Sequence, residues 1–189
     1  ACGNEDEEIL SKYTLKETFV DDDFVLPSTI SGKEVSWTSS NTDSIEVTKR
    51  TDDWLADVKL ADDTKTVNLT VKCGKAEKSF EVTIQALDVN YIAGKYNFKY
   101  DKSSVYKDFA LDSSFVYEGK TASITWTVDN KYTDYINISE DGKTCKVTES
   151  TIDQEVKINA MFSYNSKTTT VPYRMNVTFE RKHLQEVDY

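Results

Sequence analysis

The sequence has few of the residues that bend or break a chain: two prolines and six glycines among 189 residues. Such a composition excludes a collagen-like chain and a long linker rich in these residues. The single histidine, His183, lies close to the C-terminal end, so a histidine-based catalytic site would have to form there. We expect His183 to be a solvated side chain and the protein to have no enzymatic activity.

Positive charge is also scarce, since 23 lysines and arginines face 33 aspartates and glutamates and the net charge is −10. Nucleic-acid binding depends on lysine and arginine neutralising phosphates, so we expect no nucleic-acid partner. Long runs of helical periodicity are absent, as is any apolar run that could span a bilayer. Eleven tyrosines, eight phenylalanines and three tryptophans supply the bulky side chains of a core made by strands.

Cysteine is limited to three residues, of which Cys2 follows Ala1 and precedes an acidic run. Ala-Cys is what remains when a lipoprotein signal peptide is trimmed, and the acidic run resembles the export tether of Bacteroidetes surface lipoproteins. This resemblance implies a tether over residues 1–8 and a lipid on Cys2. It also implies a place on the cell surface or outer membrane, with membrane contact only through the lipid anchor. The alternatives are a free thiol near a disordered end and a cloning remnant.

The other two cysteines, Cys73 and Cys145, fall at different places in the repeat described below. We therefore predict two free thiols and no disulfide between sheets of the kind found in antibody domains. The spacing Cys-x-x-Cys is absent, which argues against a cysteine metal site. Acidic groups such as Asp21 to Asp23, Asp52-Asp53 and Asp62-Asp63 suit Ca²⁺ or, more often, solvated loops. We expect no metal and no cofactor.

A short stretch with one tryptophan occurs twice, in residues 31–41 and 118–130. In both copies a polar turn around a glycine precedes a strand, an aliphatic residue stands two positions before the tryptophan, and a second polar turn follows. The two tryptophans, Trp37 and Trp126, are 89 positions apart. That spacing is typical of a β-sandwich of about a hundred residues used twice. We predict that Trp37 and Trp126 belong to the structural core.

The flanking residues repeat as well. Asp23-Phe24-Val25-Leu26-Pro27 corresponds to Asp108-Phe109-Ala110-Leu111-Asp112. Each copy ends with two alternating segments that predict a closing hairpin. Further strands are predicted between the tryptophan and this hairpin, and Asp141-Gly142 is a hairpin turn signal. The predicted strands cover residues 45–47, 54–60, 67–72, 79–84, 135–138, 144–148, 156–164 and 171–180.

These motifs together resemble the bacterial immunoglobulin-like domains, most closely the type called atrophied. The match is Phe-x-Leu-Pro, then a glycine, then a strand Val-x-Trp-x-Ser-Ser-Asn, then a terminal hairpin. In the second copy Asp112 replaces Pro27 and Val128 replaces Ser39. The resemblance implies an all-β chain of two tandem immunoglobulin-like β-sandwich domains, over residues 9–88 and 89–180, followed by a tail at 181–189. Members mostly serve as spacers or accessory modules.

Two segments outside the repeat are less regular. Residues 9–23 predict a short helix or coil, with the first strand of the sandwich near Phe24 to Leu26. Residues 86–90 lack glycine and proline, so we expect a fairly stiff junction between the two copies. Directly after it, Tyr96, Phe98 and Tyr100 alternate and predict a strand with one aromatic face. Such a row more often belongs to a core than to a binding surface.

Two classes of function remain open. The first is a non-catalytic adhesive or spacer protein on the cell surface, with a surface protein or glycan as partner. The alternative is a carbohydrate-binding accessory protein of a glycan-utilisation system. Its candidate ligand-binding residues are Trp54, Tyr91, Tyr96 and Tyr100, because aromatic rings stack on sugars. Exposure of these rings favours the alternative, and their burial favours the first class.

Overall fold

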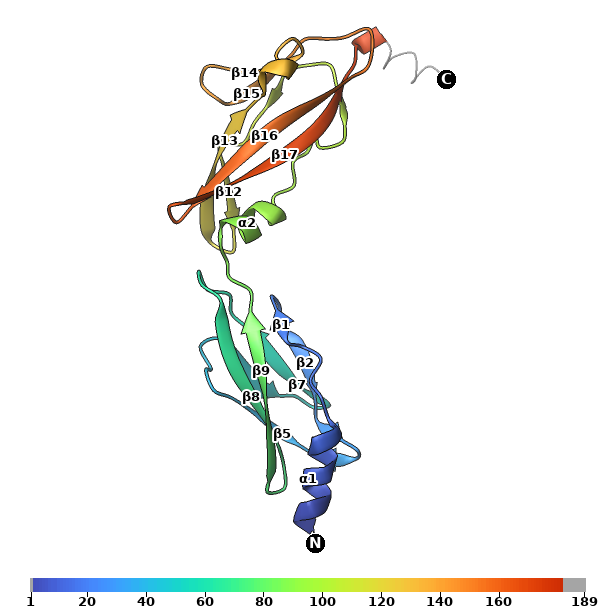
Figure 1. Ribbon diagram of the computed structural model, residues 1–189, viewed down its shortest axis with the longest axis vertical. Coiled ribbons are helices and arrows are strands. Elements are labelled where there is room, and N and C mark those ends of the chain that lie inside the picture. The colour runs from blue at the N-terminus through green and yellow to red at the C-terminus, as the bar shows by residue number, and fades with distance from the viewer. Residues whose placement is uncertain (1, 182–189) are drawn as a thin grey trace. The chain divides into compact units, whose positions relative to one another are not determined.

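The computed structural model describes residues 2–181, with side chains described from residue 5 onward. The chain forms two compact units that meet in sequence between Leu87 and Asp88, called unit 1 and unit 2 below (Figure 1). The predicted C-terminal tail, including His183, lies outside the described residues except for Arg181. Within the described part of the chain, no helix has the length and apolar character needed to cross a membrane.

Unit 1 contains one helix and two main sheets. The four-stranded sheet has the order β1-β9-β8-β5, and the three-stranded sheet has the order β2-β7-β6. All pairs in these sheets are antiparallel except β1 with β9, and the short β3 and β4 form a separate hairpin. The elements are α1 (Cys2–Lys12), β1 (Phe19–Val20), β2 (Phe24–Pro27), β3 (Thr29–Ile30), β4 (Lys33–Glu34), β5 (Ser36–Ser39), β6 (Ile45–Lys49), β7 (Asp53–Val58), β8 (Lys65–Cys73) and β9 (Ala76–Ile84).

Unit 2 repeats this plan, with longer strands in its larger sheet and shorter strands in its three-stranded sheet. Its five-stranded sheet has the order β10-β17-β16-β13-β12, its three-stranded sheet has the order β11-β15-β14, and β10 pairs with β17 in parallel. The elements are α2 (Val89–Lys95), β10 (Ser104–Val105), β11 (Phe109–Ala110), β12 (Ser114–Tyr117), β13 (Lys120–Thr127), the 3₁₀ helix η1 (Asn130–Tyr132), β14 (Ile136–Ile138), β15 (Thr144–Val147), β16 (Gln154–Tyr164) and β17 (Lys167–Val177).

Both units have the strand connections of an immunoglobulin-like sandwich. The sets β2-β7-β6 and β11-β15-β14 correspond to strands B, E and D of that fold, and β5-β8-β9 and β13-β16-β17 correspond to C, F and G. Each unit therefore has a two-sheet arrangement in which the chain changes sheets between strands B and C, C and D, and E and F. The predicted fold class, all-β with tandem immunoglobulin-like sandwiches, is confirmed.

The core of each unit comes from the alternation of side chains along its strands. In β8, for example, Val67, Leu69 and Val71 are fully buried and face the same side. Residues of the opposing sheet, among them Leu26 and Ile45, belong to the same buried cluster. Fully burying a side chain of this size contributes roughly 1.5–3 kcal/mol. Trp37 on β5 and Trp126 on β13 are both buried. Strand C of an immunoglobulin domain carries a buried tryptophan at the same position.

An aspartate just before strand B ties the three-stranded sheet together in both units. The Oδ1 atom of Asp23 accepts a hydrogen bond from the main-chain N–H of Val58 at 2.7 Å. Asp108 accepts from the N–H of Val147 in the same way, at 2.8 Å. Both N–H groups lie at the end of strand E, β7 or β15, so the equivalent aspartates make equivalent bonds. The repeat seen in the sequence is thus also a repeat of specific contacts.

The turn before each tryptophan strand is equally well matched. Ser31 and Gly32 have φ values of 51° and 77°, and Glu118 and Gly119 have 49° and 74°. Two successive residues with positive φ define the tight hairpin turn that the right-handed twist of strands favours. Glycine adopts this conformation without a steric penalty, which explains why it is the residue shared by both copies.

The N-terminal segment is helical, and its helix starts before the short helix or coil predicted within residues 9–23. A helix, α1, extends from Cys2 to Lys12 and covers most of the stretch predicted as a tether at 1–8. Leu10 is buried in the core of unit 1, and Ile9 and Tyr13 pack against that core. The carboxylate of Asp6 lies 3.6 Å from Lys33 Nζ and accepts a hydrogen bond from the thiol of Cys73. Part of the acidic run is therefore folded onto the sandwich.

The strand predicted over Tyr96 to Tyr100 is wrong. Residues 89–95 form α2, and Tyr96, Phe98 and Tyr100 follow it in irregular and turn structure. The helix begins after Asp88, whose side chain accepts a hydrogen bond from the N–H of Tyr91 at 2.9 Å. Such an N-cap satisfies one of the free N–H groups at a helix start. Leu87, one residue earlier, is bonded through its N–H to Ala61 of unit 1.

Candidate functional site

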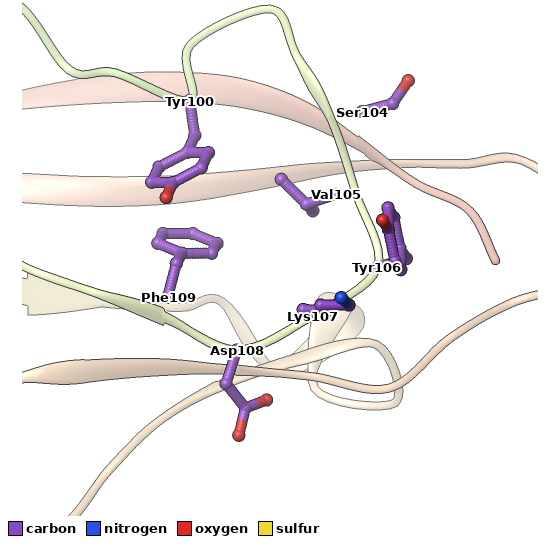
Figure 2. Close-up of a pocket in the computed structure, with 7 residues that line it drawn as sticks. All are labelled: Tyr100, Ser104, Val105, Tyr106, Lys107, Asp108 and Phe109. Atoms are coloured by element: carbon purple, nitrogen blue, oxygen red, sulfur yellow. The ribbon is translucent and has the colours of Figure 1, made fainter. Parts of the chain in front are cut away.

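A small open hollow lies on unit 2, in the segment from Tyr100 to Phe109 that contains β10 and the start of β11 (Figure 2). Its volume is about 260 Å³. Three aromatic rings line it, and Figure 2 shows Tyr106 across the hollow from Tyr100 and Phe109, with Val105 between them. The lining residues are Tyr100, Ser104, Val105, Tyr106, Lys107, Asp108 and Phe109.

The position of β10 and β11 in different sheets creates this hollow. β10 extends the five-stranded sheet, where Asn176 N–H donates to Ser103 O and Thr178 N–H donates to Val105 O, each at 2.9 Å. A few residues later, Phe109 pairs with Cys145 in the three-stranded sheet. The chain therefore crosses from one sheet to the other between Val105 and Phe109. Because both of these side chains are buried, they fix the crossing segment to the core.

The aromatic walls are held by contacts with one another and with the core. The ring centroids of Tyr100 and Phe109 lie 4.1 Å apart at an interplanar angle of 31°. Phe98 contacts both rings, at 5.9 Å from Tyr100 and 6.2 Å from Phe109. The ammonium of Lys107 lies 5.4 Å from the centroid of the Tyr106 ring. Stacked rings with few rotatable bonds make a pre-ordered apolar wall.

The carboxylate in the lining is occupied by structural contacts. Asp108 accepts the hydrogen bond from Val147 and lies 3.3 Å from Lys146 Nζ. These contacts, the Val147 N–H first, hold the pKa of Asp108 below its usual value. Figure 2 shows its carboxylate directed away from the rings. Asp108 thus remains ionised and contributes no acid group to the hollow.

A second hollow adjoins the first at Ser104, which lines both. It has a volume of about 320 Å³ and takes in Lys102, Glu155, Arg174 and Asn176. Arg174 Nη1 lies 2.8 Å from Glu155 Oε1, so that carboxylate is paired. Lys102 lines this second hollow, Lys107 lines the first, and both side chains are exposed.

Trp54, predicted as a candidate sugar platform, lies on β7 of unit 1 and packs against the core. It is only partly buried, and its Nε1 atom is buried without a hydrogen-bond partner among the described residues. Trp54 belongs to unit 1, whereas the aromatic hollow and the predicted tyrosines belong to unit 2.

The three predicted tyrosines occupy different environments. Tyr96 is part of the packing of unit 2, since its ring contacts Phe115, Trp126 and Phe162. Its hydroxyl donates to Asp112 at 2.7 Å, and burial and this carboxylate raise the pKa of Tyr96. Tyr91, in α2, meets Tyr117 edge to face at 5.9 Å. Tyr100 alone lines the hollow.

Tyr106 and Lys107 complete the hollow and are not among the four candidate ligand-binding residues, although Tyr106 ends the aromatic segment from Tyr91 that the sequence offers as a glycan platform. Tyr106 belongs to a crowded group of aromatic residues after position 90, which is the one available signal. Its position across the hollow from Tyr100 depends on the crossing of the chain between the two sheets, which no local sequence pattern predicts. Among residues whose side chains are described, no group of three or more histidine, cysteine or acidic residues is placed to hold a metal. The side chain of Cys2 lies outside this described part, so its lipidation stays a prediction.

Comparison with known proteins gives only distant likenesses. No protein-family model matches the chain, and no curated protein sequence matches it. Among solved structures, an endo-fucoidan hydrolase of glycoside hydrolase family 107 has 18% identity and a TM-score of 0.38, over 87% of this chain and 27% of that one. Human protocadherin-24 domains EC1-2 have 13% identity and a TM-score of 0.32, over 89% and 96%. The insect immune protein hemolin has 16% and 0.30, over 89% and 49%.

The chain spans about a quarter of the length of the fucoidan hydrolases, at 27% coverage. The TM-scores of 0.30 to 0.38 are too low to transfer a function from any of these structures.

Proposed function

We propose that this chain is a non-catalytic, lipid-anchored protein of the cell surface whose immunoglobulin-like units act as adhesive or spacer modules. The observation that carries the proposal is the repetition of the same internal contacts in both units. Asp23 and Asp108 bind equivalent strand N–H groups, and Trp37 and Trp126 fill equivalent core positions. A module that is stabilised from within can be repeated to build length or present a surface.

The state of the carboxylates supports a non-catalytic role. Asp53, Asp108 and Asp141 have lowered pKa values, because Arg50, the Val147 N–H and Ser139 respectively hydrogen-bond to the ionised forms. A glycosidase or other general acid catalyst requires a carboxyl group whose pKa is raised. These three acids serve to hold turns and strands together.

Surface exposure on intact cells tests this proposal. In cells producing the complete protein from its own gene, an external protease should remove the chain, while a cytoplasmic marker in the same cells stays intact. Replacing Cys2 with alanine should release the chain from the membrane fraction. Protection from the protease, with the chain recovered in the soluble cytoplasm, would contradict the proposal.

The second candidate function, carbohydrate binding, is favoured by the aromatic hollow of unit 2. Tyr100 and Tyr106, both partly exposed, supply aromatic surface beside polar groups, and the buried Phe109 stacks against Tyr100; this is the composition of a small-molecule site. A glycan array probed with the purified chain should then show saturable binding that Tyr106→Ala abolishes. If Trp54→Ala removes the binding while Tyr106→Ala does not, the site lies on unit 1 instead.

A further inference from the structure

We propose that the hollow of unit 2 binds a pyranose residue that carries a negative charge, as a carboxylate or a sulfate. This inference rests on carbohydrate binding, the second function proposed above, and specifies its ligand class. The volume of about 260 Å³ is below the range of roughly 300–1,000 Å³ for drug-sized ligands, so the hollow accommodates one ring.

The walls of the hollow suit the apolar faces of a sugar. Tyr106 stands across from the Tyr100–Phe109 pair, and Val105 forms the base between them (Figure 2). The C–H groups of a pyranose ring pack against aromatic faces, while its hydroxyls project toward the rim. The contacts of Phe109 and Val105 with the core keep this geometry fixed before the ligand arrives, which lowers the entropic cost of binding.

The charge around the hollow points to an anion. Lys107 lines the first hollow, with its ammonium 5.4 Å from the centroid of the Tyr106 ring, and Lys102 lines the second; both residues are exposed. The carboxylates of the two hollows are paired: Asp108 is bound to Val147 and Lys146, and Glu155 is bound to Arg174 within the second hollow, so Lys102 and Lys107 supply the remaining charge. In a chain of net charge −10, this is a local excess of positive charge. Such complementarity selects anionic ligands and makes their binding sensitive to salt.

The shared wall at Ser104 extends the site beyond one sugar. For a ring in the first hollow, the next residue of a polymer would lie beside Ser104, where Lys102, Asn176 and the Arg174–Glu155 pair line the second hollow. The geometry therefore favours an anionic polysaccharide or oligosaccharide over a free monosaccharide.

The test is affinity gel electrophoresis of the whole chain with three probes: polygalacturonate, dextran sulfate and uncharged dextran. The first two probes separate carboxylate from sulfate, and the third measures neutral binding. Tyr106→Ala and Lys107→Ala are the test variants. Tyr132→Ala, elsewhere on unit 2, and Lys72→Ala, on the outer face of unit 1, are matched controls. Thermal unfolding of each variant separates loss of binding from loss of fold.

We expect one or both anionic probes to retard the chain and dextran to leave it unaffected. Tyr106→Ala and Lys107→Ala should each weaken binding by about tenfold, and added salt should weaken it further. The controls should bind as the unchanged chain does. If only polygalacturonate retards the chain, the ligand's charge is a carboxylate; if only dextran sulfate does, the charge is a sulfate.

Three results would overturn the inference. Equal binding of dextran, lost in Tyr106→Ala, would keep carbohydrate binding and remove the charge preference. Anionic binding unchanged by Tyr106→Ala and Lys107→Ala in folded variants would place the ligand elsewhere. Retardation by no probe, together with a blank glycan array, would contradict carbohydrate binding itself while leaving the anchored surface role to its own test.

Discussion

The indole nitrogen of Trp37 donates a hydrogen bond to the main-chain oxygen of Pro27, at 2.9 Å. In unit 2, Trp126 donates to the main-chain oxygen of Asp112 at 2.7 Å. Asp112 is the residue that replaces Pro27 in the second copy of the repeat. The acceptor is a backbone carbonyl in both cases, so the change of side chain leaves the bond intact. This explains how the repeat persists where the sequences differ.

Trp37→Ala should lower the free energy of unfolding of unit 1 by about 3–5 kcal/mol, because it leaves a large cavity in a packed core. Trp37→Phe should cost less, about 1–3 kcal/mol, mainly because the Pro27 oxygen loses its donor. Urea denaturation followed by circular dichroism measures both. Val25→Ala, on the exposed face of β2, is the control and should change the stability by less than about 0.5 kcal/mol. A Trp37→Ala cost as small as the control would contradict the assigned role.

Asp108→Ala should reduce stability in a pH-dependent way. The pKa of Asp108 in the folded chain lies below the usual 3.8, mainly because of the Val147 N–H. Its stabilising effect is therefore fully present above the ordinary pKa and is lost as the pH falls through the lowered one. The Tm of the variant should lie below that of the unchanged chain near neutral pH, and the difference should shrink below pH 3.8. Asp63→Ala, in an exposed loop, is the control. A difference that grows in acid would contradict this assignment.

Lys78→Met should loosen α1 from unit 1. The Lys78 ammonium donates to the main-chain oxygens of Leu10, Ser11 and Tyr13, at 3.1, 3.4 and 2.7 Å. A cation at the C-terminal end of a helix satisfies its free carbonyl groups. We expect a loss of about 1–3 kcal/mol and faster amide hydrogen exchange in residues 5–12. Lys75→Met, exposed in the same hairpin, should leave exchange unchanged. Fast exchange in the unaltered chain would show that α1 is not docked.

The thiols of Cys73 and Cys145 should not react with Ellman's reagent in the folded chain. Both are free, as predicted, and both are buried; burial raises the pKa of Cys145 to about 12. The thiolate is the reactive species, so its concentration at neutral pH is minimal. In a Cys2→Ser variant, two thiols should become reactive only after unfolding in urea. Rapid reaction of either thiol without urea would contradict the burial.

The sandwich could be predicted from sequence because its signals are local. Alternating residues around Trp37 and Trp126, the Gly32 and Gly119 turns and the two closing hairpins all appear in the structure as strands and turns. In these segments, the alternation of apolar and polar residues and the turn residues favour the same strands and turns that the fold contains.

The extent of α1, the helix α2 and the aromatic hollow could not be predicted in this way. Docking of α1 depends on Asp6 reaching Lys33 and Cys73, residues far away in sequence, so the acidic run alone suggests only a solvated tether. Tyr96, Phe98 and Tyr100 alternate as in a strand, yet they follow α2 in an irregular segment that packs on the same core. The hollow itself arises where the chain changes sheets after Val105.

The central claim, a protein anchored at the cell surface through Cys2, is tested most directly by the mass of the native N-terminal peptide. The protein is purified from the membrane fraction of cells that produce it from its own gene and is then digested with a protease. The account predicts a peptide that begins at Cys2, without Ala1, and carries a diacylglyceryl group on sulfur. A native peptide that contains an unmodified Cys2, or one that continues upstream through Ala1, would contradict it.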